Sequence, residues 1–88
     1  MKNDKLESKR IQKLANEINQ DMLKTYGPVL YGKDLYLCLG YKSISGFYRA
    51  LKSDQLEVEV FDIENKRGKH ALTKDVALWL ARSKLLPK

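Results

Sequence analysis

The stretch KDLYLCLGYKSISGFYRALK, residues 33–52, decides the fold that the sequence predicts. Its first part is rich in leucine and stops at a glycine, which suits the left-handed end of a helix. Ser43 or Ser45 can then cap a second helix that runs to Leu51 or Lys52. Two short helices joined by a tight turn of this kind predict a helix-turn-helix, whose second helix enters the major groove of DNA.

The second of these helices has two distinct faces. Phe47, Ala50 and Leu51 form its apolar face. Arg49 lies on the polar face, where it can donate two hydrogen bonds to guanine or contact a phosphate instead, and the residues alone leave both roles open. Tyr48 can contact the DNA backbone through its hydroxyl or cover the edge of the core. Phosphate contacts are expected from side chains near the two ends of the helix, namely Lys42, Ser43, Ser45 and Lys52.

Before this stretch, residues 5–24 predict one long amphipathic helix, which ends at Gly27. We therefore divide the chain into an N-terminal helix, residues 1–26, and a second domain, residues 29–86. The helix either docks on its own domain or joins two copies of the chain, and the sequence favours neither. In the second case a chain that begins near Val29 still folds but associates less. The dimer interface would then be the narrow apolar stripe of Ile11, Leu14, Ile18 and Met22.

After the stretch the hydrophobic period changes. Residues 56–60 alternate between apolar and polar side chains, which predicts a half-buried strand. A polar turn follows, and residues 70–72 are expected to return as the partner strand of a hairpin. Thr73 is expected to cap a last helix, in which Trp79 serves as an anchor of the core.

The composition bounds the function. The chain has 88 residues, 43% hydrophobic and 32% charged, as expected of one small globular domain. No apolar run is long enough to span a membrane. Cys38 is the single cysteine and is expected to be a small core residue in a reducing, cytoplasmic setting. With His70 as the single histidine, expected in a solvated loop, the sequence predicts neither an enzyme nor a metal or cofactor site.

The charge points to a nucleic acid as the partner. Seventeen basic residues against eleven acidic ones give a net charge of +6 and a pI near 9.5. A basic balance of this size is typical of proteins that bind nucleic acid. Lys66, Arg67 and Lys69 fall within four consecutive residues of the predicted hairpin turn. There they either follow the sugar-phosphate backbone or enter a minor groove, and a solvated hairpin tip is the alternative.

Helix-turn-helix, hairpin and helix is the order of a small winged helix, with the hairpin as its wing. Four short motifs support it: Leu35–Gly40 with Tyr41, Phe47-Tyr48-Arg49, Arg67-Gly68, and Asp75–Leu80. From Leu30 to Arg82 the sequence resembles the AlpA-type and excisionase-like DNA-binding modules of phages and mobile elements, distant relatives of the MerR winged helices. It departs from their pattern in a turn that is one residue longer and in a strand, residues 56–60, without the usual proline. The resemblance implies a bacterial or phage transcriptional regulator or a directionality factor for recombination.

The sequence therefore predicts an α+β, mostly α fold, namely a small winged helix-turn-helix with an extra N-terminal helix. The predicted function is sequence-specific binding of double-stranded DNA, by a homodimer or by cooperative binding, with no membrane and no small-molecule substrate. The alternative is a protein–protein adaptor or antitoxin-like module that binds through the N-terminal helix. The DNA-binding side chains are expected to be Lys42, Ser43, Ser45, Tyr48, Arg49, Lys52, Lys66, Arg67 and Lys69.

Overall fold

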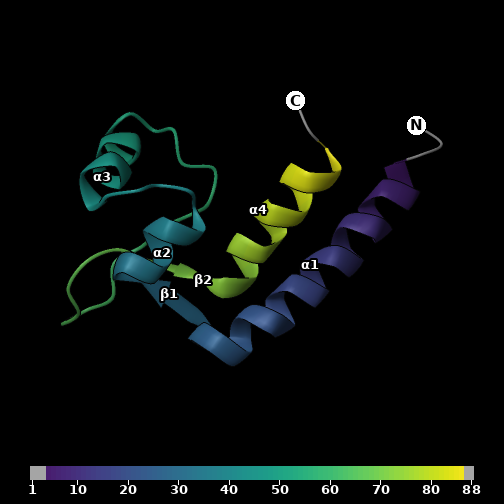
Figure 1. Ribbon diagram of the computed structural model, residues 1–88, viewed down its shortest axis with the longest axis horizontal. Helices are drawn as coiled ribbons and strands as arrows, with labels where there is room; N and C mark the ends of the chain where they lie inside the picture. Colours follow the sequence, from purple (N-terminus) through teal and green to yellow (C-terminus); the bar gives the residue numbers. More distant parts are fainter. Residues whose placement is uncertain (1–3, 87–88) are drawn as a thin grey trace.

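Two short strands tie together parts of the chain that lie far apart in sequence. The computed structural model describes residues 4–86, so the first three residues of the predicted N-terminal segment lie outside it. β1 pairs antiparallel with β2, with Val29 opposite Leu72 and Leu30 opposite Ala71. The described part of the chain is a mostly helical α+β fold (Figure 1). Its elements are α1 (Asp4–Tyr26), β1 (Val29–Tyr31), α2 (Gly32–Cys38), α3 (Ile44–Lys52), β2 (His70–Leu72) and α4 (Thr73–Leu85).

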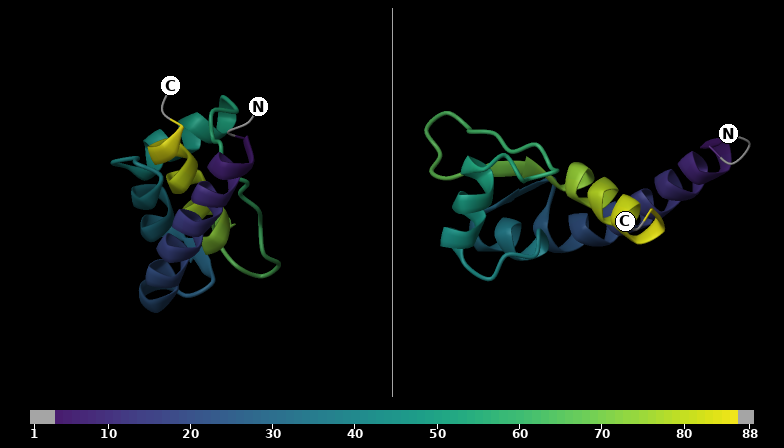
Figure 2. Two further views of the ribbon diagram at one scale, coloured as in Figure 1. Left: turned by 90° about the vertical axis from the view of Figure 1, so that its right-hand side faces the viewer. Right: turned by 90° about the horizontal axis from the view of Figure 1, so that it is seen from above.

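α1 and α4 run side by side in opposite directions, so that both termini lie at one end of the molecule (Figures 1 and 2). Their contact is more extensive than that between any other two elements. Ala15 and Met22 of α1 are buried, as are Val76 and Ala81 of α4. α1 therefore docks on its own chain, and a chain without α1 would expose part of the buried side of α4.

The core receives a buried side chain from every described helix and strand, because the two strands and α4 lie between the long helix α1 and the pair α2–α3. Cys38 is half-buried and packs against this core, as its apolar neighbours in the sequence predict. Burial of side chains of this size is the main favourable term in the folding of so small a chain. The buried cluster consists of Met22, Leu30, Leu35, Leu39, Phe47, Val58, Ala71, Val76 and Ala77.

The predicted hairpin is wrong in its pairing. Residues 56–60 are irregular in the structure, and β2 pairs with β1 instead. Phe61 makes a single bridge to His70, through two backbone hydrogen bonds of 2.8 Å. The alternation nevertheless predicted burial correctly, since Val58 lies in the core. The physical reason is that alternation reports which side chains face the core, whereas a strand also requires a second backbone at hydrogen-bonding distance.

Two further expectations near β2 are corrected. His70 is 5% exposed rather than solvated, because the strand pairing sets it between the rings of Tyr31 and Phe61, with ring centroids at 5.6 and 6.2 Å. Thr73 does not cap α4 but is its first residue. Its hydroxyl donates a hydrogen bond of 2.6 Å to the carbonyl of Gly27, which joins the start of α4 to the end of α1.

Candidate nucleic-acid interface

α2 and α3 are joined by a tight turn over residues 39–43. Gly40 adopts a φ of +93°, a left-handed conformation in which glycine carries no steric penalty. Its N–H donates to the carbonyl of Leu37 at 3.0 Å, and the N–H of Tyr41 donates to the carbonyl of Tyr36 at 2.9 Å. These bonds satisfy carbonyls that the end of α2 would otherwise leave open. The glycine stop predicted from the sequence is thus confirmed.

Ser43 begins α3. Its backbone is extended, and its Oγ accepts a hydrogen bond of 3.1 Å from the N–H of Gly46, the usual geometry of a helix cap. Of the two serines that the sequence offered as caps, Ser43 has this role, and Ser45 is exposed in the first turn. The first turn of α3 contains no acidic residue. Its free amide groups are therefore the most favourable place on this helix for an anion.

α3 presents a polar, basic face to solvent. Phe47 and Ala50 are buried, and the opposite side carries Ser45, Arg49 and Lys52, which are spaced four and three residues apart. All three are exposed, and the Arg49 and Lys52 side chains have no ion-pair partner among the side chains that the structure describes. Two unpaired cations on one exposed helix face can bind an anionic partner without first breaking a contact within the protein.

Tyr48 lies at the border between the two faces. It is half-buried and packs against the core, with its ring edge-on to that of Phe47 at a centroid distance of 5.4 Å. Of the two roles that the sequence left open for Tyr48, the structure shows the cover over the core edge. Lys42, in the turn before α3, is exposed.

The other predicted contact surface is the basic loop, residues 62–69. Asn65 and Gly68 adopt positive φ values of 66° and 80°, which turn the chain sharply on both sides of Lys66 and Arg67. Lys66 and Arg67 are exposed. Lys69 differs from them, because its side chain is 31% exposed and its Nζ pairs with Asp62 at 3.0 Å. The loop thus offers two free cations and one that is partly neutralised.

α3 and the basic loop lie at the same end of the molecule, opposite the termini (Figure 1). A shallow groove of about 230 Å³ joins them, and we call it the apolar groove. Its walls include Ile44 and Tyr48 of α3, Arg67 and Lys69 of the basic loop, and Tyr31 of β1. Arg67 and Lys69 line this groove, whereas Arg49 and Lys52 are not among its lining residues and lie on the polar face of α3.

Two residues of this end were missed by the sequence analysis. Ile44 is 51% exposed at the first position of α3, and Tyr31 is 62% exposed at the end of β1. Ile44 lies three residues before Phe47 and seven before Leu51, on the apolar side of α3, so helical spacing alone predicts its burial. No local signal would have found Tyr31, because its place depends on the pairing of β1 with β2.

The stripe predicted as a dimer interface is largely used inside the chain. Met22 belongs to the buried core, and Ile18 packs against it. Ile11 and Leu14 are half-buried. Because α1 lies along α4, these side chains are engaged by their own chain, and Met22 offers almost no surface to a second copy.

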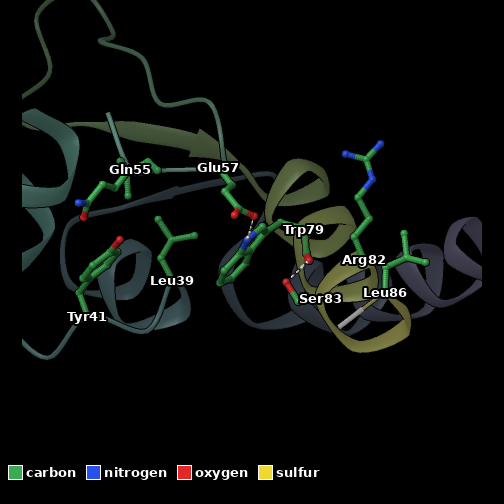
Figure 3. Close-up of a pocket in the computed structure, with 9 residues that line it drawn as sticks. Leu39, Tyr41, Gln55, Glu57, Trp79, Arg82, Ser83 and Leu86 are labelled. Carbon is green, nitrogen blue, oxygen red and sulfur yellow. Dashed lines mark hydrogen bonds between the residues drawn. The ribbon is translucent and has the colours of Figure 1, made fainter. Parts of the chain in front are cut away.

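A larger hollow, of about 460 Å³, lies on another part of the surface between α4, the end of α2 and residues 55–57 (Figure 3). Trp79 forms one wall of it, and its Nε1 donates a hydrogen bond of 3.1 Å to Glu57 Oε2. Ser83 Oγ donates to the carbonyl of Trp79 at 2.8 Å, while Arg82 points away from the indole. Trp79 is half-buried at the edge of the core, which is a less central place than the predicted anchor.

Within the described residues, no group of three or more His, Cys, Asp or Glu side chains is placed to hold a metal ion. None of the helices in this part of the chain has the length and apolar character needed to cross a membrane. No family model, no curated protein and no solved structure matches the chain.

Proposed function

We propose that this protein binds double-stranded DNA in a sequence-specific manner, as a transcriptional regulator or a recombination directionality factor. In this proposal α2 and α3 act as a helix-turn-helix, with α3 in the major groove and the basic loop on the neighbouring backbone. The observation that carries the proposal is that α3, with the unpaired cations Arg49 and Lys52, lies at the same end of the molecule as the basic loop, with Lys66 and Arg67.

The dimensions and chemistry of α3 suit a major groove, which is wide enough to admit one helix. The exposed face of α3 carries Ser45 in its first turn and Arg49 in its second turn. Lys42 lies just before the helix, and Lys52 is at its C-terminal end. Arg49 is the side chain suited to two parallel hydrogen bonds with guanine, and lysines at the ends suit phosphates. Phosphate contacts set the position of the helix, and Arg49 reads the sequence.

A dimer held together by α1 is no part of this proposal, because the apolar stripe of α1 already packs on α4. The same packing counts against the adaptor alternative, which relied on α1 as a free binding face. The hollow beside Trp79 has one acidic and one basic residue in its lining, Glu57 and Arg82, and so no excess of charge that selects a partner.

Selection of bound duplexes from a random pool, followed by affinity measurements in rising salt, tests the proposal. Arg49→Ala should weaken binding to the selected duplex by about 1–3 kcal/mol and affect random duplex much less, because a base contact discriminates by that amount. Replacing Lys66 and Arg67 together by Ala should weaken both alike. The log–log salt slope should then become shallower by about 2, since each neutralised phosphate contributes about 0.9.

The matched control is the double replacement of Arg82 and Lys84 by Ala, which removes the same charges from an exposed part of α4. This variant should keep most of its affinity and its full salt slope, because neither residue lies near α3 or the basic loop. All variants should melt like the wild type. Failure of the wild-type chain to bind any duplex at low salt, or equal losses in the control and the loop variant, would refute the proposed interface.

A further inference from the structure

An apolar surface lies in the middle of the basic end of the molecule. The apolar groove has Arg67 and Lys69 on one side and α3 on the other. Ile44 and Tyr31 are 51% and 62% exposed, although both are large apolar side chains. Single exposed apolar residues are common on proteins, but two of them beside one groove between two sets of cations form a defined feature.

Ile44 keeps 51% of its surface exposed to solvent. Tyr48, its neighbour on the next turn of α3, is half-buried and packs against the buried cluster, whereas the more exposed Ile44 lines the groove beside it. Ile44 is also the first residue of α3, directly after the cap Ser43. In helices that read DNA, side chains of the N-terminal turns are the ones that reach the base edges. Its position is therefore that of a reading residue.

The proposed function limits what this side chain meets. A duplex that contacts both α3 and the basic loop must pass over the groove between them. In the major groove the base edges carry hydrogen-bonding groups, with one apolar exception, which is the 5-methyl group of thymine. An aliphatic side chain beside an apolar hollow matches that group and offers no hydrogen bond to any other base edge.

Resting on the proposed function, we propose that Ile44 and the apolar groove recognise the 5-methyl group of a thymine in the bound DNA. The contact sets a thymine preference at one or two positions of the bound site, from a different side of α3 than Arg49. Arg67 lines the same groove, and its guanidinium is placed to hold a phosphate of the strand that carries the thymine. Specificity then has two chemically different parts, one polar and one apolar.

The test removes the methyl group alone. In the selected duplex each thymine is replaced in turn by deoxyuridine, which keeps every hydrogen-bonding group and the base pairing. The wild-type chain should lose about fourfold in affinity at one or two positions, the effect expected for burying one methyl group. Replacement at the remaining thymines should leave the affinity unchanged.

A double-mutant cycle assigns the effect to the side chain. Ile44→Ala should bind the thymine duplex about fourfold more weakly and should no longer distinguish thymine from deoxyuridine at the sensitive position. The control is Leu86→Ala, since Leu86 is 45% exposed near the end of α4, and it should behave like the wild type. If Ile44→Ala lowers the melting temperature, the deoxyuridine replacements measured with the wild-type chain still test the methyl contact.

The outcomes separate the two proposals. A chain that binds a selected duplex but tolerates deoxyuridine at every position refutes the methyl contact and leaves DNA binding intact. So does an Ile44→Ala variant that stays as sensitive to deoxyuridine as the wild type, because another group then contacts the methyl. A chain that binds no duplex refutes both proposals.

Discussion

Replacing Thr73 by Val should destabilise the protein, although the two side chains have nearly the same shape. Thr73 is fully buried, and its hydroxyl donates to the carbonyl of Gly27 at 2.6 Å, while its N–H donates to the carbonyl of Pro28 at 2.9 Å. The first of these bonds is lost in Thr73→Val, which leaves the Gly27 carbonyl, itself half-buried, without that donor. Loss of a buried hydrogen-bond partner costs about 1–3 kcal/mol of stability. Because Gly27 is only half-buried, the expected loss for Thr73→Val is in the lower part of this range, about 1–2 kcal/mol.

Urea and thermal unfolding measure this loss directly. For a chain of this size 1 kcal/mol shifts the melting temperature by roughly 4–8 °C, so a decrease of about 4–16 °C is expected. Thr73→Ser keeps the hydroxyl and should lose only the contribution of one methyl group, about 1 kcal/mol. Thr25→Val is the matched control, because Thr25 is exposed on α1 and should change stability by less than about 0.5 kcal/mol. Equal stability of Thr73→Val and the wild type would refute the structural role of this bond.

Four other perturbations test the packing and the raised pKa of Tyr26. Met22→Ala should lower the free energy of unfolding in urea by about 2–4 kcal/mol, because it leaves a cavity in the core. A chain that begins at Val29 should show no cooperative thermal unfolding, and a folded, stable short chain would mean that α1 is dispensable. Trp79→Ala should lower the free energy of unfolding by about 2–3 kcal/mol, less than the loss expected for a fully buried tryptophan. A variant that melts normally but no longer binds DNA would instead place Trp79 in the interface. A hydrogen bond with Cys38 and the charge of its thiolate raise the pKa of the Tyr26 hydroxyl above its ordinary value near 10. As the pH rises, the unfolded chain releases this proton before the folded chain does, so the free energy of unfolding falls above about pH 10. Cys38→Ala should lower the pKa of Tyr26 in an absorbance titration and remove that part of the fall in stability. An unchanged titration would exclude Cys38 as the cause.

Features that depend on a few neighbouring residues could be predicted from the sequence. The end of α1 at Gly27, the glycine stop after α2 and the serine cap of α3 all rest on hydrogen bonds between residues three to five positions apart. The basic face of α3 follows from helical spacing once its start is known. The division of residues 56–60 into inward and outward side chains also follows from local pattern. Each of these features is stabilised by contacts between residues close together in the sequence, which do not depend on the tertiary structure.

The tertiary structure decided what joins across the chain. Residues 29–31 had no local feature that marked them as the partner of β2. A segment becomes a β-strand only when a second backbone satisfies its hydrogen bonds. The same pairing buried His70 and exposed Tyr31. Thr73 donates to a carbonyl 46 residues away, so its role as a tie rather than a cap was invisible in its neighbourhood.

The sequence by itself determined the helices, their ends and the excess of positive charge, because these depend on residue type and short-range spacing. Only the tertiary structure decided that α1 covers α4 and that the basic loop lies against α3, with the apolar groove between them. The physical reason is that packing energy depends on which surfaces meet. The sequence shows that α1 has an apolar stripe, but not whether that stripe packs on the same chain or on a second copy. For Met22 that surface proved to be the core of its own chain, and for Ile44 it proved to be solvent.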